Sequence, residues 1–163
     1  MENNSKIDRV ELACQLFCEG ANCAQAVAAA FCDVVDMDKA TLLRLSSSFG
    51  GGMGRMREVC GACSGMFLIA GFLWGYDDTA DDEAKKAHYA RIQQMAEKFR
   101  AKHGTIICRE LLASLKPTET PEPTKRTAEF YKVRPCVRFV ETAAEILEQM
   151  LQEENGVQSE LSQ

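Results

Sequence analysis

The sequence predicts an all-α fold: a single-domain bundle of six to eight helices around a central apolar helix at about residues 58–75. Apolar residues recur at helical spacing in almost every segment, whereas no segment shows the alternation that a strand requires. The chain has 163 residues, the usual length of one domain, and its composition of 46% apolar and 26% charged residues suits a buried core. We therefore expect one helical domain over residues 1–155.

The expected helices follow the apolar stripes in chain order. The first three begin near Ile7, after Asn22 and after Asp38, and the last two of these residues are typical N-caps. A long charged helix is expected to open with a capping box at Thr79–Asp82 and to end at Gly104.

The second half of the chain is interrupted by a loop. A short helix is expected after Thr105, and residues 116–124 contain three prolines, which predicts a loop before another short helix at 126–132. The last helix is expected to begin at Pro135, because proline suits the first helical position. Residues 156–163 are predicted to form a disordered tail.

The central helix raises the question of a membrane. Val59–Tyr76 carries no charged residue over eighteen positions, which is the lower limit for a membrane span. A helix that is apolar on all sides is also typical of the centre of a bundle, and we favour that interpretation. The N-terminus lacks the basic and apolar segments of a leader, so we expect a cytoplasmic protein. The net charge of −5 argues against nucleic-acid binding.

The eight cysteines point to thiol chemistry, because cytoplasmic cysteines stay reduced unless they are catalytic, sensing or metal-bound. Cys23, Cys108 and Cys136 each lie in the first turn of an expected helix and begin its apolar stripe. Cys60 follows a glycine-rich run and lies near the start of the central helix. A helix start stabilises a thiolate through its free N–H groups and its dipole. These four cysteines are therefore the candidate site.

The other four cysteines carry weaker signals. Cys14, Cys18 and Cys32 lie inside expected helices, where free cysteine usually fills the core. Cys63 forms a CxxC pair with Cys60, but the βαβ context that makes this motif specific for a disulfide oxidoreductase is absent. Structural zinc sites usually bring two such pairs, and the sequence has one.

Four segments carry a resemblance to a known family. They are Asn22-Cys-Ala-Gln-Ala-Val27, Cys60-Gly-Ala-Cys-Ser-Gly65, Cys108-Arg-Glu-Leu-Leu112 and Arg134-Pro-Cys136. From about Cys14 to Leu151 the chain resembles the bacterial and archaeal family of redox-active proteins named for its CGCAxxGCC cysteine motif. The resemblance implies that the motif cysteines fall on Cys23, Cys60, Cys108 and Cys136, that Gly61, Ala62 and Gly65 complete the central element, and that Cys63 fills a variable position. It implies a redox or iron–sulfur role, suggested by the family's cysteines and by neighbouring oxidoreductase or transporter genes.

The first functional hypothesis is a thiol redox or electron-transfer protein, which would make the chain an oxidoreductase with a redox partner still to be identified. In the dithiol version Cys60, near Arg57 and Cys63, is the expected nucleophile, and one of the others resolves the mixed disulfide. In the other version the four helix-start cysteines bind an iron–sulfur cluster or a thiophilic metal ion. The residues expected around that cofactor are Gly51, Gly52, Gly54, Gly61 and Arg57.

Two further hypotheses stay open at this point. One is a non-catalytic metal- or ligand-binding accessory protein, serving a transporter, in which the cysteines capture a soft ion. The other is a structural bundle that forms a homo-oligomer through faces of small residues. The redox and metal hypotheses both require that Cys23, Cys60, Cys108 and Cys136 meet in space.

Overall fold

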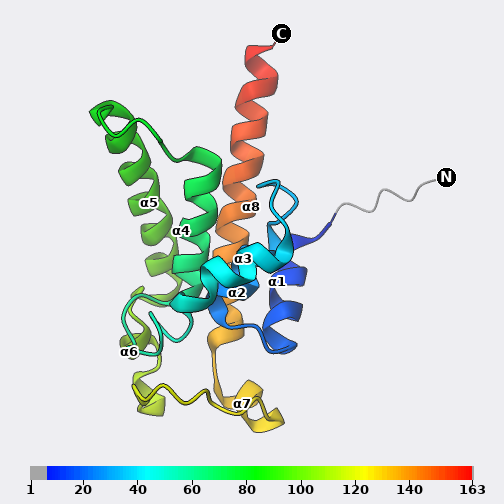
Figure 1. The fold of residues 1–163 in the computed structure, drawn as a ribbon, viewed down its shortest axis with the longest axis vertical. Helices are drawn as coiled ribbons and strands as arrows, with labels where there is room; N and C mark the ends of the chain where they lie inside the picture. Colours follow the sequence, from blue (N-terminus) through cyan, green and yellow to red (C-terminus); the bar gives the residue numbers. More distant parts are fainter. Residues whose placement is uncertain (1–6, 163) are drawn as a thin grey trace, which may run out of the picture.

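The computed structural model describes residues 7–162, and Figure 1 shows a bundle of helices. The α-helices are α1 (Arg9–Cys18), α2 (Cys23–Ala30), α3 (Lys39–Ser46), α4 (Gly61–Trp74), α5 (Asp82–His103), α6 (Cys108–Leu111), α7 (Ala128–Val133) and α8 (Cys136–Leu161), and two 3₁₀ turns are η1 (Ser47–Phe49) and η2 (Ala113–Leu115). Over these residues the only β pairing is one isolated bridge, between Val59 and Ile107. The predicted all-α bundle is confirmed. The expectation that the N-terminus lacks a leader concerns mainly residues 1–6, which lie outside the described residues.

The bundle has two sides that meet at α8. Helices α4, α5 and α8 lie side by side with nearly parallel axes, and α1, α2 and α3 pack on the other side of α4 and α8 (Figure 1). Helices α6 and α7, with the loop between them, lie at the end of the bundle where α8 begins (Figure 1). The core sits between α2, α4 and α8, whose inward residues are almost all apolar and fully buried.

Capping side chains explain where the helices near the site begin. Asn22 and Gln25 form a capping box at α2, and the Asp38 carboxylate accepts from the Thr41 N–H at α3, so both predicted N-caps are confirmed. The predicted box at Thr79–Asp82 is wrong. Asp78 accepts from the N–H groups of two following residues and so holds Thr79 in a turn, and Asp81 caps α5 instead.

The central apolar helix is α4, within the range that the sequence predicts. Gly65 lets α4 pack closely on α2, because any larger residue would place its Cβ atom 2.6 Å from the carbonyl oxygen of Ala24. The far end of α4 is less covered, and Phe72 is 45% exposed. Across residues 7–162 we find no helix whose length and apolar character would suffice to span a membrane.

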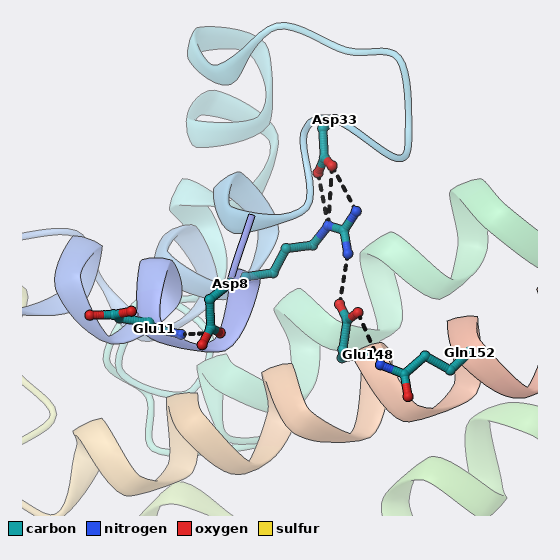
Figure 2. A network of polar contacts seen from close by, with 6 residues as sticks. Asp8, Glu11, Asp33, Glu148 and Gln152 are labelled. Carbon is teal, nitrogen blue, oxygen red and sulfur yellow. Dashed lines mark hydrogen bonds and ion pairs between the residues drawn. The ribbon is translucent and has the colours of Figure 1, made fainter. Parts of the chain in front are cut away.

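The first and last helices are tied by one arginine. Arg9 of α1 donates to the Asp33 carboxylate, which follows α2, and to the Glu148 carboxylate of α8, at 2.7 and 2.8 Å (Figure 2). These ion pairs are only partly exposed. They join three segments that are distant in the sequence, namely α1, the turn after α2, and α8.

The C-terminus differs from its prediction. Residues 156–163 are expected to be a disordered tail, but α8 continues to Leu161 and projects beyond the bundle (Figure 1). A long helix that is already nucleated by packing adds each further residue at little cost, and this outweighs the unfavourable Gly156. Gln163 lies outside the described residues.

Candidate functional site

A pocket of about 320 Å³ opens at the end of the bundle where α8 begins. Cys23, Cys60, Cys108 and Cys136 all line it. Three of them are the first residues of α2, α6 and α8, and Cys60 immediately precedes α4. The sequence placed these cysteines at helix starts, and the structure brings all four to one pocket.

Close backbone approach brings the cysteines together. A Cβ atom added to Gly52 would lie 2.7 Å from the Cβ of Cys108, and one added to Gly61 would lie 3.2 Å from the Cβ of Cys23. A side chain at either position would require the neighbouring cysteine or the glycine segment to shift. Gly51 and Gly54 also line the pocket, but no cysteine atom is among the nearest neighbours of either.

The glycine-rich run forms an unusual left-handed turn. Five consecutive residues from Gly51 to Arg55 have φ between 56° and 71°, and Arg57 has φ of 60°. The left-handed region costs roughly 1–2 kcal/mol for each residue with a side chain, here Met53, Arg55 and Arg57. Backbone hydrogen bonds compensate, such as that from the Arg57 N–H to the Gly51 carbonyl at 3.2 Å. The turn brings the side chain of Arg57 into the lining of the pocket.

The segment after this turn pairs with the segment before α6. The N–H of Cys60 donates to the Ile106 carbonyl at 2.7 Å, and the N–H of Cys108 donates to the Glu58 carbonyl at 2.6 Å. These bonds flank the Val59–Ile107 bridge. The bridge therefore holds the backbone segments of Cys60 and Cys108 next to each other at the pocket.

Two of the four thiols, Cys23 of α2 and Cys136 of α8, act on each other at the pocket. The Cys23 side chain, aided by the nearby Arg134 and Arg126 guanidinium groups, lowers the pKa of Cys136 to about 7 against the effect of burial. The Cys136 side chain, together with burial, raises the pKa of Cys23 well above its ordinary range. Cys136 is therefore the thiolate of this pair near neutral pH, and Cys23 keeps its proton.

Cys60 and Cys63 form a second pair at the start of α4. The Cys63 thiol and the N–H groups of Ala62 and Cys63 lower the pKa of Cys60, while burial raises the pKa of Cys63. Cys60 lines the pocket, whereas Cys63 is fully buried in the core and does not line it. Cys63 therefore has no direct contact with the pocket and acts on it only through its effect on Cys60.

Cys108 has a cation as its partner instead of a thiol. The Nη1 atom of Arg57 lies 3.9 Å from its Sγ atom, and Nε of the same guanidinium donates to the Thr118 carbonyl at 2.9 Å. Burial raises the pKa of Cys108, and Arg57 opposes this rise. Arg57, expected near the site, thus contacts a cysteine from the other side of the bridge.

The remaining cysteines lie away from the pocket. Cys32 is half-buried and packs against the core, Cys14 is half-buried, and Cys18 is exposed, so the expectation that these cysteines fill the core is wrong for Cys18. Cys32 follows the end of α2, and Cys18 is the last residue of α1. Helical spacing alone did not reveal how close each lies to a helix end, where side chains reach solvent.

The fit of the site to a metal ion depends on how closely its donors converge. In the part of the chain that the structure describes, no three Cys, His, Asp or Glu side chains lie close enough together to hold one ion. The cysteines form pairs at one pocket and do not converge on one point, so they do not fit a mononuclear metal site in this arrangement.

A comparison with models of protein families shows to which family the chain belongs. A model of the family described as "Putative redox-active protein (C_GCAxxG_C_C)" matches residues 21–150. The chain belongs to this family. The match to the C_GCAxxG_C_C family includes all four pocket cysteines. No curated protein and no solved structure gives a significant match to the chain.

Membership in the C_GCAxxG_C_C family does not account for everything at the pocket. Sequence reasoning missed the pairing of Cys23 with Cys136, because the two are far apart in the chain and no local pattern links them. It also missed Arg55 and Arg126, which line the pocket. Arg126 does precede α7 in a segment rich in aromatic residues, and its guanidinium stacks on Phe17 and Phe130.

Proposed function

We propose that the protein is a dithiol–disulfide redox protein in which Cys136 and Cys23 are the exchanging pair. The observation that carries this proposal is that Cys23 and Cys136, the first residues of α2 and α8, line the same pocket and shift each other's pKa in opposite directions. An attacking thiol is most effective when its pKa is near the ambient pH, and the pKa of Cys136 is about 7. Cys136 thus combines thiolate character with a resolving thiol at the same pocket.

The reaction transfers two electrons to a disulfide substrate. The Cys136 thiolate attacks one sulfur of the substrate, the S–S bond breaks, and the first thiolate leaves while Cys136 is held in a mixed disulfide. Cys23 then gives its proton to the departing thiolate and attacks the Cys136 sulfur. The second substrate thiolate leaves, and the product is a Cys23–Cys136 disulfide. Both cysteines are oxidised, and the substrate is reduced to two thiols, the second of which takes its proton from the solvent.

This assignment replaces Cys60 as the expected nucleophile. The partner of Cys60 is Cys63, which is sealed in the core, so a mixed disulfide on Cys60 would be resolved less easily from that side. Cys60 and Cys108 complete the pocket around the exchanging pair. We also propose a cytoplasmic location, where the reducing environment keeps such a pair in the dithiol form.

Peptide mapping after mild oxidation tests the proposal. One equivalent of a small neutral disulfide should produce a Cys23–Cys136 bond as the major product. Cys23→Ser should stop the reaction at the mixed disulfide on Cys136, and Cys18→Ser, at an exposed cysteine outside the pocket, serves as the matched control. A product in which Cys136 stays reduced would contradict the proposal.

The four pocket cysteines also support a second candidate, an iron–sulfur cluster, whose cysteine ligands stand further apart than those of a single ion. Such a cluster would bind to Cys23, Cys60, Cys108 and Cys136 and supply one-electron transfer. Anaerobic purification followed by an absorption spectrum and iron and sulfide analysis separates the two candidates. Stoichiometric iron and sulfide that are lost in a Cys136→Ser variant would favour the cluster over the dithiol.

A further inference from the structure

The pocket is strongly cationic in an acidic protein. Arg55, Arg57, Arg126 and Arg134 line it, no aspartate or glutamate does, and the chain has a net charge of −5. Among residues 7–162, none of these four arginines forms an ion pair with a carboxylate, although other arginines of the chain do. The nearest opposite charges are the Cys136 thiolate, beside Arg134 and Arg126, and the Glu122 carboxylate, which lies beyond ion-pair distance of Arg55. Most of the positive charge at the pocket therefore has no carboxylate partner.

Neutral groups hold these arginines in place. Arg55 donates to the Thr120 carbonyl at 2.7 Å, and Arg126 donates to the carbonyls of Phe17 and Ala21 at 3.1 and 3.0 Å. Arg57 is 2% exposed, and its Nη2 atom has no hydrogen-bond partner within the described residues. A buried cationic group with an unused donor is costly unless an anion compensates it.

Much of the remaining lining is apolar, beside the polar side chains of Asn22, Ser47 and Thr124. Three phenylalanines, two leucines and two prolines contribute to it, namely Phe17, Phe130, Phe139, Leu111, Leu112, Pro121 and Pro123. A volume of about 320 Å³ is at the lower end for small-molecule sites. An inorganic oxyanion would leave this apolar wall without a contact, whereas a small organic anion can contact both the wall and the arginines.

We propose that the pocket binds a small organic disulfide that carries carboxylate groups, with the arginines receiving the carboxylates and the apolar wall receiving the carbon chain. This inference rests on the proposed dithiol function, because the disulfide of the bound molecule is the one that Cys136 attacks. The exchange is the one described above: the bound disulfide accepts two electrons and leaves as two carboxylate-bearing thiols, and Cys23 and Cys136 become a disulfide.

Three symmetrical disulfides of similar length test the charge preference. They are 3,3′-dithiodipropionate with two carboxylates, bis(2-hydroxyethyl) disulfide, which is neutral, and cystamine with two ammonium groups. Single-turnover rates with the reduced protein should be fastest for the dicarboxylate and slowest for cystamine, with the dicarboxylate on the order of tenfold faster than the neutral probe. A thiolate without the cationic pocket favours the opposite order, since a negative sulfur attracts a positive disulfide.

A matched pair of variants locates the effect. Arg55→Gln should lower the ratio of the dicarboxylate rate to the neutral rate several-fold. Arg44→Gln, at an exposed arginine outside the pocket, should leave that ratio unchanged. Salt should lower the same ratio, because ions screen the attraction between the carboxylates and the arginines.

Binding of suberate separates the failure of this inference from the failure of the proposed function. Suberate has the same chain as 3,3′-dithiodipropionate with two carbons in place of the sulfurs, so calorimetry reports binding without reaction. Saturable binding to the wild-type protein that weakens several-fold in Arg55→Gln supports the site even if no disulfide reacts. Equal rates for the three probes together with no suberate binding would overturn the inference, while the neutral probe still measures the dithiol reaction.

Discussion

Nη1 of Arg57 lies 3.9 Å from Sγ of Cys108, and the same guanidinium holds the Thr118 carbonyl through Nε. One side chain thus joins a pocket cysteine to the loop between η2 and α7. Because Arg57 opposes the rise in the pKa of Cys108 that burial causes, its loss should make this thiol still less acidic.

Arg57→Gln is therefore expected to slow the labelling of Cys108 by iodoacetamide at pH 8 several-fold, measured by peptide mass spectrometry. Arg57→Lys keeps a positive charge and should restore part of the rate. Arg109→Gln, at an exposed neighbour of Cys108 that pairs with Glu58, is the control. Faster labelling of Cys108 in a folded Arg57→Gln protein would contradict the role assigned to this contact.

The reactivity of Cys136 should follow pH with a midpoint near 7, the pKa that its contact with Cys23 produces. Below this pH the thiol is protonated and reacts slowly, and above it the thiolate dominates. Cys23→Ala removes the polar hydrogen of the thiol and should move the midpoint upward, while Cys23→Ser keeps a polar O–H group and should move it less. Labelling rates of Cys136 between pH 5 and 9 measure this, and identical midpoints for Cys23→Ala and the wild type would refute the contact.

Oxidation of the proposed pair should stabilise the fold. A Cys23–Cys136 disulfide closes a loop of roughly a hundred residues. Because it lowers the entropy of the unfolded chain, it should raise the free energy of unfolding by about 4–5 kcal/mol. For a domain of this size the melting temperature should rise by on the order of 10–20 °C. Calorimetry of the oxidised and reduced proteins tests this, with Cys23→Ser as the control that should not respond. An unchanged melting temperature with the bond verified by mass spectrometry would show that the geometry is strained.

Two glycines of α4 provide a matched test of close packing. Gly65→Ala would place a Cβ atom 2.6 Å from the Ala24 carbonyl oxygen, whereas Gly71→Ala meets no atom within 4 Å. Gly65→Ala should destabilise the protein by about 1–3 kcal/mol and also displace Cys23, which adjoins Ala24. Gly71→Ala should stabilise it by about 0.5–1 kcal/mol, because alanine favours the helix. Urea unfolding measures both, and equal effects would mean that α2 and α4 are not in close contact.

The Arg9 network predicts a dependence of stability on pH. Arg9→Met should lower the free energy of unfolding at pH 7 by about 2 kcal/mol, because it breaks charged hydrogen bonds to Asp33 and Glu148. Arg9 lowers the pKa of Asp33 in the folded state, so this stabilisation is present above the ordinary aspartate pKa and is lost as the pH falls through the lowered one. The difference between the two proteins should therefore shrink below about pH 4. Lys85→Met, at an exposed pair with Asp82, should change stability by less than about 1 kcal/mol at either pH.

Much of the fold could be predicted because its signals are local. Asn22 and Asp38 cap helices through side chains only three residues from their partners, and Gly104 ends α5 with a positive φ. The placement of four cysteines at helix starts followed from the same local signals. Thr79 misled the prediction because the competing Asp78 turn gives no separate sequence signal.

The pairing of the thiols could not be predicted, because it depends on tertiary contacts. Cys23 meets Cys136 only because α8 packs against α1 and α2, a contact that Arg9 helps to fix. The left-handed conformation of Met53 and Arg55 also follows from the backbone bonds around the turn and not from the preferences of these residues. The absence of carboxylates from the pocket lining emerges only when segments from five regions of the chain are brought together.

The position of Cys136 at the start of α8 has a consequence for how the protein is made. Cys23, Cys60 and Cys108 leave the ribosome before Cys136, and at typical synthesis rates Cys136 follows Cys23 by on the order of ten seconds. During this interval the acidic thiol of the pocket does not yet exist, and Cys23 has no partner to which it can donate its proton. The nascent protein therefore acquires its proposed reactive centre in one late step, when the last helix docks on the first two.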